Sequence, residues 1–247
     1  MTECQGGSAP RTPRLFVEDE LRAGASVELP EAAAHHATRV LRLKDGDAVV
    51  LFDGRGGEYA ARLATAGRGR LFAQTGERRE PARESPLAVT LIQGVSSSDR
   101  MDLTVQKAVE LGVAAIHPVL TEKSVVRLSG EREAKKLAHW RRIAIAACEQ
   151  CGRNLVPEVR EPMPLDRYRP PAGSKILLSP SGSARLADLA KAPVVLAAGP
   201  EAGFSGREEQ LLLQAGFTPV RLGPRILRTE TAALAALAAL NALAGDF

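Results

Sequence analysis

The chain has 247 residues, a formal net charge of +4 and a sequence pI of about 9.2. This length suits one large domain or two modest ones, and the mild basic excess permits an anionic partner without proving one. Aromatic residues make up only 4% of the chain, which argues against a protein that grips single strands mainly by base stacking. No apolar run approaches membrane-spanning length, so we expect no membrane partner.

The N-terminal stretch and the cysteines do not predict a functional site. Residues 1–13 lack an apolar signal core and predict a disordered tail on a cytoplasmic protein. The chain has three cysteines, Cys4, Cys148 and Cys151, and an odd count does not indicate a disulfide framework. Cys148 and Cys151 have zinc-like spacing, but no second cysteine pair completes a site, so we expect thiols and no metal.

Residues 14–80 predict a small β-rich unit whose strands form a barrel. Short strands are expected at 14–17, 26–29, 48–52, 58–64 and 71–75, with a helix at 31–41. Arginines recur across this unit. Scattered arginines usually form a solvated surface, although a barrel with basic loops also docks RNA. The polar, proline-bounded stretch 81–86 predicts a linker between two domains.

Residues 87–247 alternate between strand and helix patterns, which indicates a parallel sheet and an α/β fold. Strands are expected at 87–95, 113–120, 175–179, 194–198 and 219–222. A helix that runs to Leu111 ends at Gly112, a long helix covers 131–152, and a short one covers 185–191. Ser205 and Glu208 fit a capping box for a further helix that ends near Gly216.

Two glycine-proline loops, close together in sequence, each follow the end of a predicted strand. They are Gly199–Gly203 and Gly223–Arg225, and each leads to a helix. Ligands bind at the carboxyl ends of strands in open α/β sheets, and glycine allows backbone amides to approach a ligand closely. Arg228 and Glu230 stand at the second helix start, where the helix dipole favours the glutamate but not the arginine. Each loop alone is an ordinary connection, but together they predict a binding site.

Several common sites are absent from the sequence. No G-x-G-x-x-G follows a predicted strand, no Walker A sequence occurs, and no serine or cysteine lies in a nucleophile elbow. The residues alone therefore predict a nucleotide-like ligand or RNA.

The two loops also carry a resemblance. GPEAGFS and LGPRILRTETA resemble motifs of the RsmE family of SPOUT-class RNA methyltransferases. The stretch MDLTVQKAVELGVAAIHPV and a W…EQ…R pattern that ends at Arg153 are also similar to that family. The resemblance extends from about Arg14 to the C-terminus. The family usually has glycine where this chain has Ala202, which raises the question of whether that position needs a backbone conformation reserved for glycine.

The resemblance implies a function and a fold. It implies methylation of N3 of a uridine in 16S ribosomal RNA of the small subunit, with S-adenosylmethionine (SAM) as methyl donor, by a homodimer. It implies a PUA-like β-barrel at 14–80 that docks RNA, and a SPOUT methyltransferase domain at 87–247 with a C-terminal trefoil knot. The alanine-rich helix after Thr231 fits either a knot or a plain dimer interface. The alternative function is a non-catalytic RNA- or ribosome-binding factor on the same scaffold.

The resemblance also implies site residues. We expect SAM to contact Leu178, Ser179, Pro180, Ala198, Gly199, Pro200, Glu201, Gly203, Leu222, Gly223, Ile226, Leu227 and Thr229. We expect RNA to contact Arg14, Arg39, Arg42, Arg55 and Arg153.

Arg228 and Glu230 are the candidate catalytic residues. Uridine N3 must lose its proton before it can attack a methyl group, and the negative charge then spreads onto O2 and O4. A guanidinium is a planar, permanent cation that suits this charge, so Arg228 is the candidate to hold it. Glu230 could orient Arg228 or accept the proton. The alternative is a structural pair that pins the loop.

Overall fold

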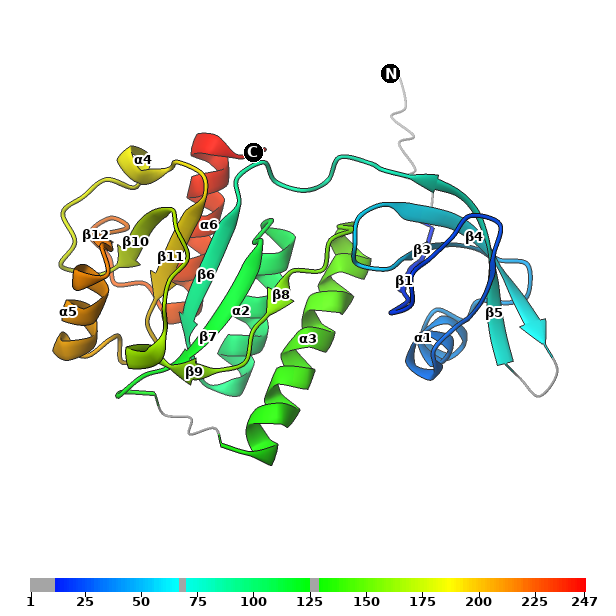
Figure 1. Ribbon diagram of the computed structural model, residues 1–247, viewed down its shortest axis with the longest axis horizontal. Coiled ribbons are helices and arrows are strands. Elements are labelled where there is room, and N and C mark those ends of the chain that lie inside the picture. Colours follow the sequence, from blue (N-terminus) through cyan, green and yellow to red (C-terminus); the bar gives the residue numbers. More distant parts are fainter. Residues whose placement is uncertain (1–11, 67–69, 125–128) are drawn as a thin grey trace, which may run out of the picture. The chain divides into compact units, whose positions relative to one another are not determined.

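A computed structural model describes residues 12–66, 70–124 and 129–247, and most of the predicted tail at 1–13 lies outside these residues. The chain divides into two compact units (Figure 1). The first unit extends as far as Arg83 and also contains Glu149–Val156. The second unit contains Glu84–Cys148 and Pro157–Phe247. Helix α3 (Glu131–Cys151) contributes residues to both units. The division after Arg83 falls within the linker expected at 81–86, whereas sequence reasoning placed residues 149–156 in the second domain.

The first unit is built on a five-stranded sheet. Its strands are β1 (Arg14–Phe16), β2 (Ser26–Glu28), β3 (Ala48–Phe52), β4 (Glu58–Ala66) and β5 (Arg70–Arg79), in the order β1-β3-β4-β5-β2. β1 pairs parallel with β3, and the other neighbours pair antiparallel. Residues along β4 alternate between the buried and exposed faces, and Ala61 and Leu63 join the apolar core of this unit.

The helix of the first unit changes its geometry halfway. The sequence predicts one helix over 31–41, but α1 (Glu31–His35) continues as the π-helical segment η1 (His36–Val40). The segment ends at Leu41, and Arg42 follows with a left-handed φ of 55°. Glycine usually occupies that position after a helix, so Arg42 adopts a conformation that is unfavourable for its residue type.

The second unit contains a parallel sheet, as the strand–helix alternation predicts. Its path is β12-β10-β11-β6-β7-β8, with β9 also paired to β7. The strands are β6 (Val89–Gly94), β7 (Ala115–Leu120), β8 (Glu158–Val159), β9 (Met163–Pro164), β10 (Ser174–Leu178), β11 (Val194–Ala198) and β12 (Thr218–Val220). β11 lies between β10 and β6, and all five of its residues are buried, which explains its continuous apolar sequence.

Helices α2 (Ser98–Glu110), α4 (Leu186–Leu189), α5 (Gly206–Gln214) and α6 (Thr229–Ala244) complete the second unit, with a short 3-10 turn η3 (Leu165–Arg167). The capping box of α5 is present: Glu208 N–H donates to Ser205 Oγ, and Ser205 N–H donates to the Glu208 carboxylate. Figure 1 shows α2 and α6 behind the strands, and the two helices pack against each other.

Both ends of α6 are held by polar contacts. Near its end, Asn241 Nδ2 donates to Leu111 O at 2.7 Å, and Ser85 Oγ donates to Asn241 Oδ1 at 2.7 Å. At its start, Thr229 Oγ1 donates to Gly199 O at 2.5 Å. The helix between these residues consists of alanine and leucine except for its first turn.

The sheet topology brings together the loops that the sequence singles out. β12, β10 and β11 are adjacent and parallel, so their carboxyl ends lie at one edge of the sheet. β6 is adjacent and parallel to β11, so its end and the start of α2 lie at the same edge. The trefoil knot implied by the resemblance stays a prediction.

Candidate active site

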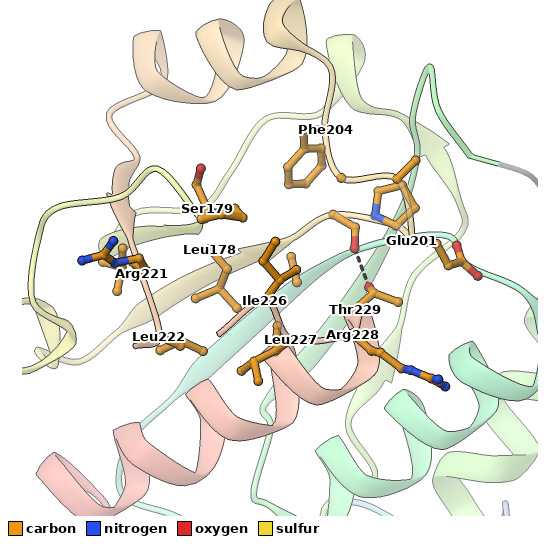
Figure 2. A pocket seen from close by; sticks show the side chains of 18 of the residues that line it. Leu178, Ser179, Glu201, Phe204, Arg221, Leu222, Ile226, Leu227, Arg228 and Thr229 are labelled. Atoms are coloured by element: carbon orange, nitrogen blue, oxygen red, sulfur yellow. Dashed lines mark hydrogen bonds between the residues drawn. The ribbon is translucent and has the colours of Figure 1, made fainter. Parts of the chain in front are cut away.

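A cavity of about 600 Å³ lies at this edge of the sheet (Figure 2). Residues that follow β10, β11 and β12 line it, together with the start of α6. Twelve of the thirteen predicted cofactor residues are among the lining residues: Leu178, Ser179, Pro180, Ala198, Gly199, Pro200, Glu201, Gly203, Leu222, Ile226, Leu227 and Thr229. Gly223 is the predicted residue that does not line the cavity. Its φ of 77° shows that its role is to form the turn beside it.

The loop after β11 explains why this chain tolerates Ala202. Among the described residues, Arg42 is the only non-glycine residue with a positive φ, so Ala202 has an ordinary backbone. Gly203 next to it has a φ of 67° and is the residue that needs glycine. The alanine therefore places a methyl group at the cavity without backbone strain.

The same loop lies directly on β6. A Cβ added to Gly94 would stand 2.5 Å from both Pro200 Cδ and Pro200 N, and 2.9 Å from the Gly199 carbonyl carbon. Only glycine at the last residue of β6 allows this approach. The adjacent residue, Gln93, is fully buried and donates from Nε2 to Thr229 Oγ1 and to Gly94 O, both at 3.1 Å. Sequence reasoning missed both residues.

Glu201 is fixed by the start of α2. Its Oε1 accepts from Ser97 N–H at 2.8 Å and pairs with Arg100 Nη1 at 3.1 Å. Burial alone raises the pKa of Glu201, but the hydrogen bonds that its carboxylate accepts, chiefly from Ser97, and the charge of Arg100 bring the pKa below its ordinary value. The Glu201 side chain is therefore a fixed anion at neutral pH.

Arg228 and Glu230 are close in sequence but do not pair. The Arg228 side chain is exposed and lines the cavity, and within residues 12–66, 70–124 and 129–247 its guanidinium makes no hydrogen bond or ion pair. Glu230 is only 8% exposed, and its ion pair is with Arg100, whose Nε lies 3.9 Å from Glu230 Oε2. Arg100 thus lies between the two glutamates. Sequence reasoning missed it because α2 is far from both motifs along the chain.

The two sides of the cavity differ in their polar groups. Figure 2 shows Arg228 and Glu201 on one side and Arg221 on the other. Ser179 lies near Arg221, and its hydroxyl is 2.9 Å from Ser181 Oγ and 3.5 Å from Glu209 Oε1. The remaining lining residues that sequence reasoning did not name are Arg100, Ala202, Phe204, Glu209, Val220, Arg221, Arg225 and Ala232.

The five arginines predicted to bind RNA fall into two groups. Arg39, Arg42 and Arg55 are exposed in the first unit. Arg14 and Arg153 are not: the Arg14 side chain is 9% exposed, and Arg153 is 5% exposed.

Arg14 instead holds the first unit together. It pairs with Glu58, donates to Asn154 Oδ1 at 2.6 Å and to Arg153 O at 3.1 Å, and stacks over the Phe52 ring at 4.7 Å. Its buried position supports a structural role. Sequence reasoning predicted an RNA contact for Arg14 because its hydrogen-bonding side chains, Glu58 and Asn154, lie 44 and 140 positions away.

No group of three or more histidine, cysteine, aspartate and glutamate side chains in the described residues is arranged to hold a metal ion. Among those residues no helix is both long enough and apolar enough to span a bilayer.

Comparisons with known proteins agree with the geometry. Residues 83–241 match the model of an RNA methyltransferase domain, and residues 29–75 match that of an RNA methyltransferase PUA domain. The Ribosomal RNA small subunit methyltransferase E of Buchnera aphidicola is 33% identical over 242 residues, which is 96% of either chain.

Two solved structures are similar over nearly the whole chain. The Ribosomal RNA small subunit methyltransferase E of Neisseria gonorrhoeae, bound to S-adenosyl methionine, has 43% identity and a TM-score of 0.87. A putative methyltransferase of Legionella pneumophila, in complex with SAM, has 41% identity and a TM-score of 0.92. Each match covers 96% of this chain and 100% of the other. The resemblance seen in the loop motifs is confirmed, and the chain belongs to the RsmE family of small-subunit ribosomal RNA methyltransferases, with a PUA-like sheet followed by a SPOUT-like methyltransferase domain.

Proposed function

We propose that this protein transfers a methyl group from SAM to N3 of a uridine in the RNA of the small ribosomal subunit. The observation that carries the proposal is the cavity at the ends of β10, β11 and β12, in a chain that shares 41% and 43% identity with two SAM-bound proteins. We infer that the protein acts in the cytoplasm, because small ribosomal subunits assemble there.

The cavity suits the proposed cofactor. Its volume lies within the range of about 300–1,000 Å³ that is usual for sites of small molecules and cofactors. Leu178, Leu222 and Leu227 offer an apolar lining for a planar base, and the glycine loops offer backbone donors and acceptors. Glu201 and Glu209 add negative charge for a ligand that carries an ammonium group and a sulfonium. When bound, SAM supplies an electrophilic methyl group.

The residues of the chain then have to prepare the uridine. Its N3 becomes nucleophilic only after its proton leaves, and the negative charge spreads onto O2 and O4. Arg228 is free of other partners within the described chain and lines the cavity, so its guanidinium can donate to those oxygens. Glu230 is the candidate to accept the proton. Because Arg100 rather than Arg228 pairs with Glu230, the two candidate residues can act independently.

Besides Arg228, other exposed arginines are candidates to dock the RNA. The exposed Arg39, Arg42 and Arg55 of the PUA-like unit are candidates to contact phosphates, because arginine binds phosphate through paired donors. At the cavity, Arg221 and Arg225 are also exposed. The buried Arg14 and Arg153 are not part of this proposal.

We also propose that the protein is a homodimer. Ile226 lines the cavity with 86% of its surface exposed, and Leu243 of α6 is 51% exposed. Exposed aliphatic side chains of this kind gain stability when a second subunit covers them. Light scattering at micromolar concentration should give the mass of two chains, and a monomer would contradict the proposal.

The experiment that tests the reaction uses labelled SAM and small-subunit RNA, both free and in assembled subunits. We expect label transfer, and nucleoside digests analysed by mass spectrometry should contain 3-methyluridine. Tight RNA binding without transfer to either substrate would favour the alternative, a non-catalytic RNA- or ribosome-binding factor. A methyl group at another nucleoside position would refute the assignment of N3.

A further inference from the structure

Gln93 and Thr229 connect the loop after β11 to the start of α6. We propose that they form a positioning pair, which fixes the Gly199 carbonyl and thereby holds the loop after β11 and the start of α6 where SAM requires them. The inference rests on the SAM site proposed above, and it assigns a role to Gln93, which does not line the cavity.

The contacts form one connected network. Gln93 Nε2 lies 3.1 Å from Thr229 Oγ1, 3.1 Å from Gly94 O and 3.4 Å from Gly199 O. Thr229 Oγ1 in turn lies 2.5 Å from Gly199 O, a contact drawn as a dashed line in Figure 2. The network therefore joins the end of β6, the loop after β11 and the first residue of α6.

The direction of each hydrogen bond follows from the chemistry of the groups. A carbonyl oxygen only accepts, so the Gln93 atom that faces Gly94 O and Gly199 O must be the NH₂ group. Thr229 has one hydroxyl hydrogen, which it donates to Gly199 O, and its oxygen accepts from Gln93. Reversing either group would place two acceptors face to face, so the network has a single arrangement.

Three further observations indicate a specific role rather than ordinary packing. The Gln93 side chain is fully buried, and Thr229 is 9% exposed, so water cannot replace their bonds easily. Thr229 is the first residue of α6, one position after the N-cap residue Arg228, and its hydroxyl donates across to Gly199 O instead of serving its own helix. The partners are also far apart in sequence, by 106 positions for Gln93 and Gly199 and 136 for Gln93 and Thr229. No local turn could hold these segments together.

Shape-conserving variants test the pair. Gln93→Met removes the amide and keeps the length of the side chain, Thr229→Val removes the hydroxyl and keeps its shape, and Thr229→Ser restores the hydroxyl. The matched control is Ser85→Ala. Ser85 Oγ also donates one bond and accepts one, to Asn241 Oδ1 and from Leu87 N–H, but it lies at the opposite end of α6.

The affinity of the full-length protein for SAM is measured by calorimetry, and the melting temperature by scanning fluorimetry. Gln93→Met and Thr229→Val should each weaken SAM binding about tenfold, the effect of losing one buried hydrogen bond of ordinary strength. The double variant should be little worse than either single one, because both changes break the same network. Thr229→Ser should bind SAM nearly as tightly as the wild type. Ser85→Ala should lower the melting temperature comparably without changing SAM affinity.

The outcomes that overturn the inference are distinct. Folded Gln93→Met and Thr229→Val variants with wild-type SAM affinity would refute the pair, and so would an equal loss of affinity in Ser85→Ala. If Gln93→Met does not fold, the comparison of Thr229→Val with Thr229→Ser decides. A wild-type protein that binds no SAM would refute the proposed function and this inference together, whereas tight wild-type binding with unaffected variants would refute this inference alone.

Discussion

Replacement of Gly94 by alanine should weaken SAM binding and slow methyl transfer, although Gly94 does not line the cavity, because the new Cβ would collide with Pro200. The new Cβ would lie 2.5 Å from Pro200 Cδ and Pro200 N, whereas ordinary van der Waals contact begins near 3.4 Å. The loop after β11 must therefore move by about 1 Å, or β6 must bend by as much. The atoms in contact belong to the backbone and to a proline ring, so no flexible side chain can absorb the shift.

The magnitude follows from the size of that shift. Forcing one carbon into a packed position costs about 1–3 kcal/mol, which lowers the melting temperature of a protein of this size by roughly 2–12 °C. A misplacement of about 1 Å at a reacting site costs about a hundredfold in rate. We therefore expect Gly94→Ala to remain folded at 25 °C, to bind SAM at least tenfold more weakly, and to lose about a hundredfold in kcat/KM.

Gly206→Ala is the matched control. Gly206 starts α5, has no left-handed φ, and leaves open space around an added Cβ. Alanine there should be neutral or slightly stabilising and should leave SAM binding and turnover unchanged. Fluorimetry, calorimetry and a methyl-transfer assay on both variants check the reasoning. Wild-type turnover in Gly94→Ala, or an equal loss in Gly206→Ala, would refute it.

Three other perturbations give separate predictions. Arg228→Ala and Glu230→Gln should each keep SAM affinity near that of the wild type and lower the single-turnover methylation rate by about a hundredfold or more. If Glu230 accepts the proton, raising the pH should partly restore the methylation rate of Glu230→Gln. Wild-type rates in both variants would place the chemistry elsewhere. Arg42→Gly should raise the free energy of unfolding by roughly 0.5–1 kcal/mol, because glycine tolerates the left-handed φ of 55°. The same variant should bind RNA more weakly. Calorimetric melts and RNA titrations measure the two effects, and a destabilised variant would contradict the strain argument. Burial, with a smaller contribution from Arg160, lowers the pKa of His117 to about 4 from 6.5, so His117 stays neutral in the fold while the unfolded chain takes up the proton first. Its contribution to stability is complete above pH 6.5 and is lost as the pH falls from 6.5 to about 4, and His117→Gln should flatten that part of the stability curve in denaturant titrations.

Local sequence signals were sufficient for much of the second unit. Ser205 and Glu208 are three positions apart, and the capping box depends on nothing else, so its prediction is confirmed. The buried run at Val194–Ala198 also identifies a central parallel strand without outside information. β12 ends at Val220, two residues earlier than predicted, and the next two residues, Arg221 and Leu222, line the cavity instead of extending the strand.

The missed features depend on contacts between distant residues. β8 and β9 have two residues each, which is too short to show any periodicity. The π-helical turn after His35 leaves the helical pattern of the sequence unchanged. Gln93 contacts the loop after β11, and Arg100 lines the cavity, only because β6 pairs with β11, whose sequence lies about a hundred positions further along the chain. Their residue types give no warning of this.

The uniform composition of α6 has a consequence for how the chain finds its register. From Ala232 to Leu240 the helix reads Ala-Ala-Leu three times. A shift by one triplet, about 4.5 Å along the axis with a rotation of roughly 60° about it, therefore presents nearly the same methyl and isobutyl groups to the neighbouring elements. Apolar packing alone discriminates weakly between these positions. Thr229 at one end and Asn241 at the other find their hydrogen-bond partners only in the observed register. A shifted helix would lose these bonds, so the two polar residues select the observed register over the shifted ones.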